Sequence, residues 1–202
     1  MKKGWLSVLI PAYNPGPYLK DILDSVINQM KEYPKVEIVV VDDGSTEDLS
    51  WVKDYPVKYR RKRNGGEPSA RNVCLSMAKG EYIQFLDADD DIYPNFLSVV
   101  FDNMTKGYDW VSYDWECDRH KEWALQNENT LMVNCAVWAY TFRTDFIGEE
   151  KFDETMKIGC DIDWLMRVLK DTNHFHDHRI FYNYCWARNE NSLCHKKARG
   201  EI

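Results

Sequence analysis

The residues best suited to chemistry in this sequence are four aspartates within five positions: Asp87, Asp89, Asp90 and Asp91. They directly follow an apolar run at 82–86 that has the length and residue types of a buried strand. Side chains alternate along an extended chain, so Asp87 and Asp89 point the same way and repel each other when ionised. A hard divalent cation prefers oxygen ligands, relieves that repulsion and keeps positions for substrate phosphates. The spacing therefore predicts a metal site at Asp87 and Asp89.

Asp90 and Asp91 have a second interpretation. Pro94 suits the first turn of a helix, and carboxylates just before such a turn often cap its free N–H groups. We therefore expect these two acids either to extend the acidic site or to cap the following helix.

The elements that position these acids alternate between strands and helices. Strands are predicted at 6–10, 36–41, 57–60 and 82–86, and helices at 19–30 and 68–79. Such alternation predicts an α/β fold with a mostly parallel central sheet flanked by helices. In these sheets ligands bind beyond the carboxyl ends of the strands. Three polar clusters fall at that edge: Tyr13 with Asn14, Asp42 with Asp43, and Asp87 with Asp89.

The second half of the chain is less regular. Helices are predicted at 96–104 and 161–169, strands at 109–117, 137–142 and 179–186, a loop at 122–134 and a polar tail from 189. The length of 202 residues suits one domain, or one domain with a short appendage.

Composition limits the classes of partner. The formal net charge of −7 argues against binding to nucleic acid or to an anionic membrane. The six cysteines form no CxxC pair, which favours buried thiols in a reducing compartment. No apolar run has the length of a transmembrane segment, and the first residues contain no signal-peptide core. We therefore expect a cytoplasmic protein.

Four motifs in the first 95 residues together resemble the family 2 glycosyltransferases of GT-A fold. They are SVLIPAYN at 7–14, VDDGST at 41–46, NGG at 64–66 followed by ARN at 70–72, and FLDADD at 85–90. The resemblance implies transfer of a sugar, with inversion, from a nucleotide-diphosphate donor, in particular a UDP-sugar, to a hydroxyl of a glycan or lipid-linked acceptor. It also implies Mn²⁺ or Mg²⁺ as the cofactor and a role in polysaccharide or glycan assembly.

The resemblance assigns roles to single residues at the donor site. Pro11, Ala12 and Tyr13 would lie against the nucleobase, and Asp42 would accept a hydrogen bond from the base ring N–H. Asp43 would only fix the turn that follows. Arg71, with its forked guanidinium, would hold diphosphate oxygens. Asp87 would face the ribose and the donor, and Asp89 would bind the metal ion.

The resemblance also places a catalytic base at the start of the helix predicted at 161–169. Inversion requires a group that takes the proton of the acceptor hydroxyl, and Asp161 is the candidate. Cys160 stands where the family usually has Glu, Asp163 is the alternative base, and an N-cap role for Asp161 remains open. Trp164 is a candidate for contact with an acceptor sugar.

The expected organisation is one catalytic domain at 1–188, with a nucleotide-sugar-binding half at 1–95 and an acceptor-binding half at 96–188, followed by the polar tail at 189–202. Arg188 and His195 could fold over the diphosphate. Two other functions stay open: a binding module that has lost catalysis, and a nucleotidyltransferase. The latter would be expected to carry a glycine-rich phosphate loop after the first strand, where this chain has Pro-Ala-Tyr-Asn at 11–14.

Overall fold

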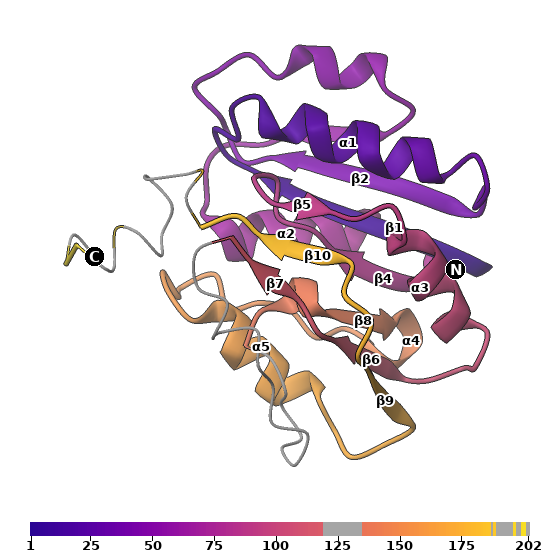
Figure 1. Cartoon of the computed structure of the whole chain (residues 1–202). Helices are drawn as coiled ribbons and strands as arrows, with labels where there is room; N and C mark the ends of the chain where they lie inside the picture. Colours follow the sequence, from indigo (N-terminus) through magenta and orange to yellow (C-terminus); the bar gives the residue numbers. More distant parts are fainter. Residues whose placement is uncertain (119–134, 187, 189–195, 197–198, 201–202) are drawn as a thin grey trace.

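The computed structural model describes residues 1–118, 135–186, 188, 196 and 199–200 (Figure 1). Seven strands form the main sheet in the order β3-β2-β1-β4-β8-β6-β9, and three short strands form a second sheet in the order β5-β10-β7. The main sheet consists of β1 (Lys2–Ala12), β2 (Val36–Asp42), β3 (Lys58–Arg61), β4 (Gly80–Phe85), β6 (Trp110–Tyr113), β8 (Tyr140–Arg143) and β9 (His174–Asp177). The second sheet consists of β5 (Asp91–Ile92), β7 (Glu116–Cys117) and β10 (Tyr182–Tyr184).

The helices cover both faces of the main sheet. They are α1 (Tyr18–Gln29), α2 (Glu67–Met77), α3 (Phe96–Met104), α4 (Thr144–Ile147) and α5 (Cys160–Val168), with 3-10 turns at η1 (Ser50–Asp54) and η3 (Val137–Ala139). The crossover from β1 to β2 runs in the opposite direction to that from β3 to β4. Right-handed crossovers therefore place α1 and α2 on opposite faces, as Figure 1 shows.

The sheet is mostly parallel, as predicted. Strands β3, β2, β1 and β4 run in one direction, so their carboxyl ends share one edge. Strand β8 is antiparallel to both β4 and β6, so β6 and its parallel neighbour β9 also end at that edge. The topology therefore brings the ends of β1, β2, β4 and β6 to one side of the molecule.

Most predicted elements are present with small shifts at their ends, and the helix at 96–104 has the predicted bounds. The strand predicted at 109–117 is wrong, because the chain leaves the main sheet after β6 and pairs with β10 as β7. The strand predicted at 137–142 begins instead with the turn η3. Strand β9 was not predicted, and the loop predicted at 122–134 lies outside the described residues.

Aromatic packing fixes helix α5 on the sheet. Trp164 is fully buried and stacks on Phe152 with ring centroids 4.7 Å apart. Its edge meets Phe142 of β8 at 5.2 Å. A buried aromatic cluster of this kind contributes its large apolar area and fixes orientation. It holds the first turn of α5, and so Asp161, against the edge where the strands end. Full burial also removes Trp164 as a contact for an acceptor sugar.

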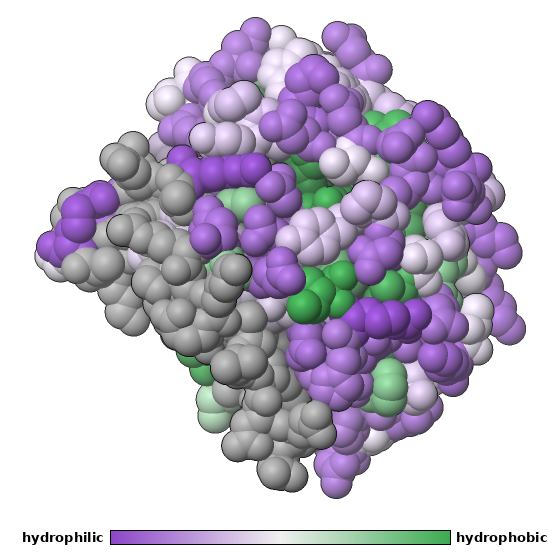
Figure 2. Space-filling view, viewed as in Figure 1, coloured by the Kyte–Doolittle hydropathy of each residue, from purple (hydrophilic) through white to green (hydrophobic). Residues whose placement is uncertain are grey.

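The face in Figure 2 is mostly hydrophilic, and hydrophobic residues are visible mainly toward the middle of the view. This agrees with the acidic composition of the chain. Among the described residues, none of the helices combines the length and the apolar character that crossing a bilayer requires.

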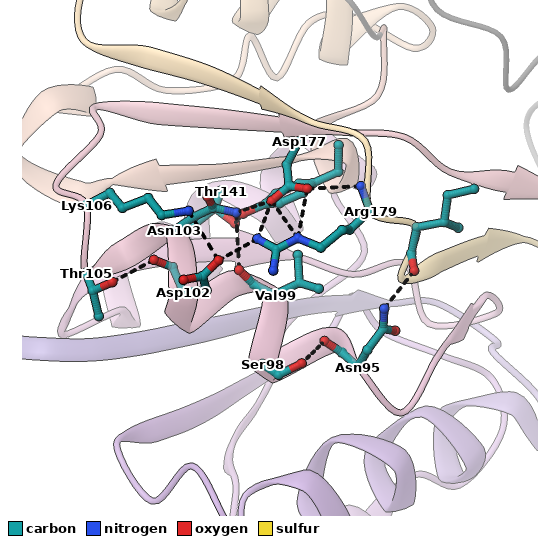
Figure 3. Close-up of polar contacts among 12 residues, drawn as sticks. Asn95, Ser98, Val99, Asp102, Asn103, Thr105, Lys106, Thr141, Asp177 and Arg179 are labelled. Atoms are coloured by element: carbon teal, nitrogen blue, oxygen red, sulfur yellow. Dashed lines mark hydrogen bonds and ion pairs between the residues drawn. The ribbon is translucent and has the colours of Figure 1, made fainter.

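The buried carboxylate of Asp177, at the end of β9, is tied to α3 by polar contacts (Figure 3). The Asp177 carboxylate accepts hydrogen bonds from Arg179 Nε at 2.9 Å and from Asn103 Nδ2 at 2.7 Å. Burial would raise the pKa of Asp177, but the bonds from Arg179 and Asn103 outweigh it and lower the pKa. Arg179 also donates to Asp102, which is half exposed. The connection between β9 and β10 is thus tied to the helix that follows the acidic segment.

We expect Asp177→Asn to lower the free energy of unfolding at pH 7 by about 2 kcal/mol, the usual worth of hydrogen bonds to a buried charge. A carboxylate whose pKa is lower in the folded state than in the unfolded state stabilises the fold at pH values above the unfolded-state pKa. This stabilisation is lost as the pH falls through the folded-state pKa. The difference from wild type should therefore shrink below pH ~4. Urea unfolding of wild type and of the Asp177→Asn variant at several pH values measures this difference in the free energy of unfolding. Asp102→Asn is the matched control, and an equal effect there would contradict the account.

Candidate active site

A cavity of about 660 Å³ opens beyond the carboxyl ends of β1 and β4. Residues from the loops after β1, β2 and β4, from the start of α2, and from the segment after β10 line it. They are Pro11, Ala12, Tyr13, Asn14, Pro15, Asp43, Asn64, Gly66, Glu67, Ala70, Asp87, Ala88, Asp89, Asp90, Tyr184, Cys185, Trp186 and Lys196. The predicted site residues Pro11, Ala12, Tyr13, Asp87 and Asp89 therefore share one cavity.

Polar contacts join the loops at the rim. Asn14, which adopts φ 48°, accepts a hydrogen bond from the N–H of Thr46 at 2.8 Å, and its own N–H donates to Ser45 Oγ at 2.9 Å. Gly44 has φ +77°, and a Cβ there would lie 2.8 Å from the N of Asn64. The close approach of two loop backbones therefore requires glycine at this position.

The two adjacent aspartates after β2 take different places. Asp42 is fully buried, accepts from the N–H of Ser45 at 2.7 Å and from Tyr59 OH at 2.9 Å, and does not line the cavity. Asp43 lines the cavity and accepts from the N–H of Gly66 at 2.8 Å and from Lys62 Nζ at 2.6 Å. Asp42 therefore does not border the cavity. Asp43, which was assigned only to the turn, does border it, although its side chain is also almost fully buried, at 3% exposed.

Within the acidic segment, Asp90 and Asp91 both contact β10 or the residues after it, and Asp90 also lines the cavity. Asp90 is buried, and accepts from Tyr182 OH at 2.5 Å and from the N–H of Cys185 at 2.8 Å. Burial and the nearby charge of Asp89 raise its pKa to about 8. Asp91 pairs with both Nη atoms of Arg188 at 2.7 and 2.6 Å.

The capping interpretation of Asp90 and Asp91 is therefore wrong. Helix α3 begins after Asn95, and the two acids instead hold β10 and the residues after it against the start of the acidic segment. Arg188 is held by Asp91 and does not line the cavity. His195 lies outside the described residues, as does most of the tail at 189–202.

Arg71 lies beneath the cavity and is almost fully buried. Its Nη2 lies 2.6 Å from Glu67 Oε1 and 3.4 Å from Asp87 Oδ1, and its Nη1 donates to Asp161 Oδ1. Burial opposes its charge, but these carboxylates, Asp161 first, raise its pKa well above the usual value. The guanidinium is thus a permanent cation shared by three acids. Because it does not line the cavity, the structure does not place it as a direct ligand of a diphosphate.

Asp161 lies at the first turn of α5, with its side chain 18% exposed. One carboxylate oxygen accepts from Arg71, and the other accepts from the N–H of Val137 at 3.1 Å. The Cys160 thiol lies a further 3.4 Å from Oδ1; a carboxylate has about four lone-pair positions, so these three donors orient it and leave capacity for a further proton. It makes no capping hydrogen bond to its own helix in the described structure.

Three residues around Asp161 complete this region. Cys160 is buried with its Sγ 3.6 Å from Arg71 Nη1, and burial raises the pKa of its thiol. Asp163, the alternative base, instead pairs with Arg167 at 2.8 Å on another face of α5. Glu67 reaches the same guanidinium from α2 and also lines the cavity. Cys160 stands where the family usually has Glu, and Glu67 of α2 brings a carboxylate to this region instead.

The carboxylates at the floor of the cavity fit a hard divalent cation. Burial and the charges of Glu67, Asp90 and Asp161 raise the pKa of Asp87 well above its usual value, despite the opposing effect of Arg71. Burial and neighbouring acids likewise raise the pKa of Glu67. Burial is the larger cause of these shifts and repulsion among the acids adds to it; a cation with oxygen ligands relieves that repulsion. Asp87 and Asp89, both lining the cavity, are the residues that would hold it.

Reasoning from the sequence missed several lining residues. Glu67 lies four residues before Arg71 but one residue before the helix predicted at 68–79; because α2 begins at Glu67, the two side chains share a helix face. Tyr184, Trp186 and Lys196 have no such local signal in the sequence. Tyr184 and Trp186 reach the cavity because β10 pairs with β5, a long-range contact between short strands that no periodicity predicts.

The sheet, the cavity beyond its carboxyl edge and the paired acids define a GT-A fold. The chain belongs to glycosyl transferase family 2, whose model matches residues 7–171. It is similar to glycosyltransferase GlyG of Streptococcus pneumoniae serotype 4, with 35% identity over 87% of this chain and 61% of GlyG. It is also similar to minor teichoic acid biosynthesis protein GgaB of Bacillus subtilis, with 36% identity over 77% of this chain and 20% of GgaB.

Solved structures share the fold. Residues 1–349 of Staphylococcus aureus TarS in complex with UDP-GlcNAc match with a TM-score of 0.77 and 23% identity, over 90% of this chain and 58% of that one. Glucosyl-3-phosphoglycerate synthase from Mycobacterium tuberculosis, in complex with Mn²⁺ and UDP, matches with a TM-score of 0.64 and 18% identity over 98% of this chain and 76% of that one. The chain spans about 60% of the length of GlyG.

Proposed function

We propose that this protein transfers a sugar from a UDP-sugar to an acceptor hydroxyl, with inversion and with Mn²⁺ or Mg²⁺ at Asp87 and Asp89. The observation that carries the proposal is the convergence of Asp87, Asp89 and the 11–13 segment on one cavity at the carboxyl edge of the sheet. UDP-GlcNAc is the first donor to test, because TarS was solved with it. GgaB's place in teichoic acid biosynthesis supports a cell-wall glycan as the acceptor.

The first half of the chain would hold the donor. Pro11, Ala12 and half-exposed Tyr13 offer apolar and aromatic surface to a nucleobase, and Asp43 offers the acceptor that was first assigned to Asp42. A divalent cation supplies charge stabilisation to the departing diphosphate. Lys196 adds a positive side chain to the cavity wall.

The second half would supply acceptor chemistry. Asp161 takes the proton of the acceptor hydroxyl as it attacks, and Arg71 and the N–H of Val137 hold its carboxylate in place. Arg71 is then a positioning residue, because it acts through Asp161, Glu67 and Asp87. Its buried charge also offsets part of the repulsion among these acids.

The role of Asp43 leads to a test of base selectivity. Uracil carries a ring N–H that cytosine lacks, and a site built to accept it rejects the analogue without it. We expect wild type to bind UDP more tightly than CDP, and Asp43→Asn to weaken UDP binding by about tenfold while narrowing this preference. Asp42→Asn is the matched control and should keep the ratio. A preference lost in the control and kept in the Asp43 variant would reverse the assignment.

The proposed activity is tested by UDP release from UDP-GlcNAc and a panel of other UDP-sugars, with Mn²⁺, with Mg²⁺ and with chelator. We expect slow metal-dependent hydrolysis without acceptor and faster turnover with wall polysaccharide fragments. Metal-dependent UDP binding without turnover on any donor would support the binding-module alternative. Release of pyrophosphate from a nucleoside triphosphate and a sugar phosphate would support the nucleotidyltransferase alternative.

A further inference from the structure

A second group of metal-ligating side chains lies away from the cavity, where β6 and β9 end. Asp114 follows β6, His176 belongs to β9, and His178 follows β9. Their ligand atoms lie within 4.8 Å of one another. Nε2 of His176 lies 3.0 Å from Asp114 Oδ1, and Nδ1 of His178 lies 3.1 Å from Asp114 Oδ2. None of the three lines the cavity.

The spacing suits a four-coordinate ion. Zinc–nitrogen and zinc–oxygen bonds are about 2.0–2.2 Å long, so ligand atoms around a tetrahedral zinc lie roughly 3.4 Å apart. The two histidine nitrogens lie 3.0 and 3.1 Å from different oxygens of Asp114, and the three ligand atoms lie within 4.8 Å of one another, so small side-chain rotations would bring them to that spacing. Asp114 and His176 are largely buried, whereas the ring of His178 is 61% exposed. The buried pair, Asp114 and His176, and the more exposed His178 therefore face one point.

A buried hydroxyl orients one of the ligands. Ser112 is fully buried on β6, and its Oγ lies 2.8 Å from Nδ1 of His176. By accepting the Nδ1–H it would leave the Nε2 lone pair directed at Asp114 and His178. Metal-bound histidines use this arrangement, in which the second ring nitrogen is held by a hydrogen bond. The N–H of Asp114 donates to the carbonyl of Asp177 at 3.2 Å, which fixes the carboxylate's backbone between the same two strands.

The donor set separates this group from the acidic cavity. Asp87 and Asp89 offer only oxygen, which suits Mg²⁺ or Mn²⁺. Two imidazoles and one carboxylate favour a transition-metal ion, and four-coordinate geometry favours zinc. Strands β8 and β6 lie between β4, which carries the acidic segment, and β9.

We propose that Asp114, His176 and His178 bind a zinc ion, with water at the fourth position, that fastens the edge strand β9 to the end of β6. Among the strands of the described residues, β9 pairs with β6 alone, and it is four residues long. A metal bound by the folded state and not by the unfolded chain stabilises the fold. The zinc ion therefore reinforces the outermost strand of the sheet.

The test uses the full chain, stripped with chelator and titrated with Zn²⁺ in excess Mg²⁺, which fills the oxygen-only site. We expect one zinc per chain, a rise in melting temperature on the order of 5 °C, and an intense four-coordinate visible band with Co²⁺ in place of Zn²⁺. His178→Ala removes a mostly exposed ring, so it should fold, and should weaken zinc binding at least tenfold. Ser112→Ala should weaken it by about tenfold through His176.

His174→Gln is the matched control, because His174 lies on β9 two residues before His176 and bonds to the carbonyl of Thr172 instead. This variant should keep the bound zinc and the Co²⁺ band. The proposal is overturned if His178→Ala binds zinc as tightly as wild type, or if His174→Gln loses as much affinity as His178→Ala. A weak six-coordinate Co²⁺ spectrum in wild type would also overturn it.

Discussion

Replacing Asp161 by Asn is expected to lower the rate of sugar transfer by about 10²–10⁴-fold, the usual contribution of a general base. The substitution keeps the shape of the side chain, and an amide oxygen still accepts from Arg71 or from the N–H of Val137. UDP affinity should therefore be unchanged, because Asp161 does not line the donor cavity. Steady-state kinetics with a saturating donor, together with UDP titration, separate the two quantities.

Glu67 provides the comparison for this experiment. It pairs with the same guanidinium, lines the cavity and has a raised pKa, so it is a second candidate for taking a proton there; Asp87 shares these features but is assigned to the metal ion. Glu67→Gln should reduce transfer far less than Asp161→Asn if Asp161 is the base. The reverse order of effects would move the base to Glu67.

Arg71→Leu is expected to lower the free energy of unfolding by about 3–5 kcal/mol, the cost of leaving buried charges uncompensated. Glu67, Asp87 and Asp161 all depend on this guanidinium. The deficit should shrink as pH falls, because the pKa values of Asp87 and Glu67 are raised and these groups become neutral under mild acid. Urea unfolding followed by circular dichroism at pH 7 and pH 5 measures both effects.

The control for this variant is Arg60→Leu, at an exposed position on β3. A surface arginine without a buried partner should change the stability by less than about 1 kcal/mol. Equal losses in the two variants, or a deficit in Arg71→Leu that grows toward pH 5, would contradict the view of Arg71 as the counter-ion of the acidic cluster.

Local patterns predicted much of the donor half. Alternating strands and helices gave the order of elements up to β4, and the rule that ligands bind at the carboxyl edge placed Tyr13, Asp87 and Asp89 in one cavity. These inferences succeed because strand direction and side-chain alternation are local properties of the chain. Alternation alone would also point Asp91 the same way as Asp87 and Asp89, but Asp91 turns toward Arg188, whereas Asp90 lines the cavity.

Long-range contacts set the rest of the site. Asp42 and Asp43 are consecutive, and which of them borders the cavity depends on the partners that Tyr59 and Gly66 supply from elsewhere in the chain. The burial of Arg71 depends on Asp161, 90 residues away in the sequence. Neither of these long-range contacts can be predicted from residue spacing or composition. Strand β9 was missed for a similar reason, since its His-Phe-His-Asp sequence has little of the apolar character of a strand.

Calorimetric titration of UDP with and without Mn²⁺, on wild type and on Asp89→Ala, tests the central claim most directly. We expect wild type to bind UDP much more tightly with Mn²⁺, and the variant, with an unchanged melting temperature, to lose that gain. Wild-type affinity that does not depend on the metal, or full metal dependence in the variant, would contradict a nucleotide-diphosphate site built around these acids.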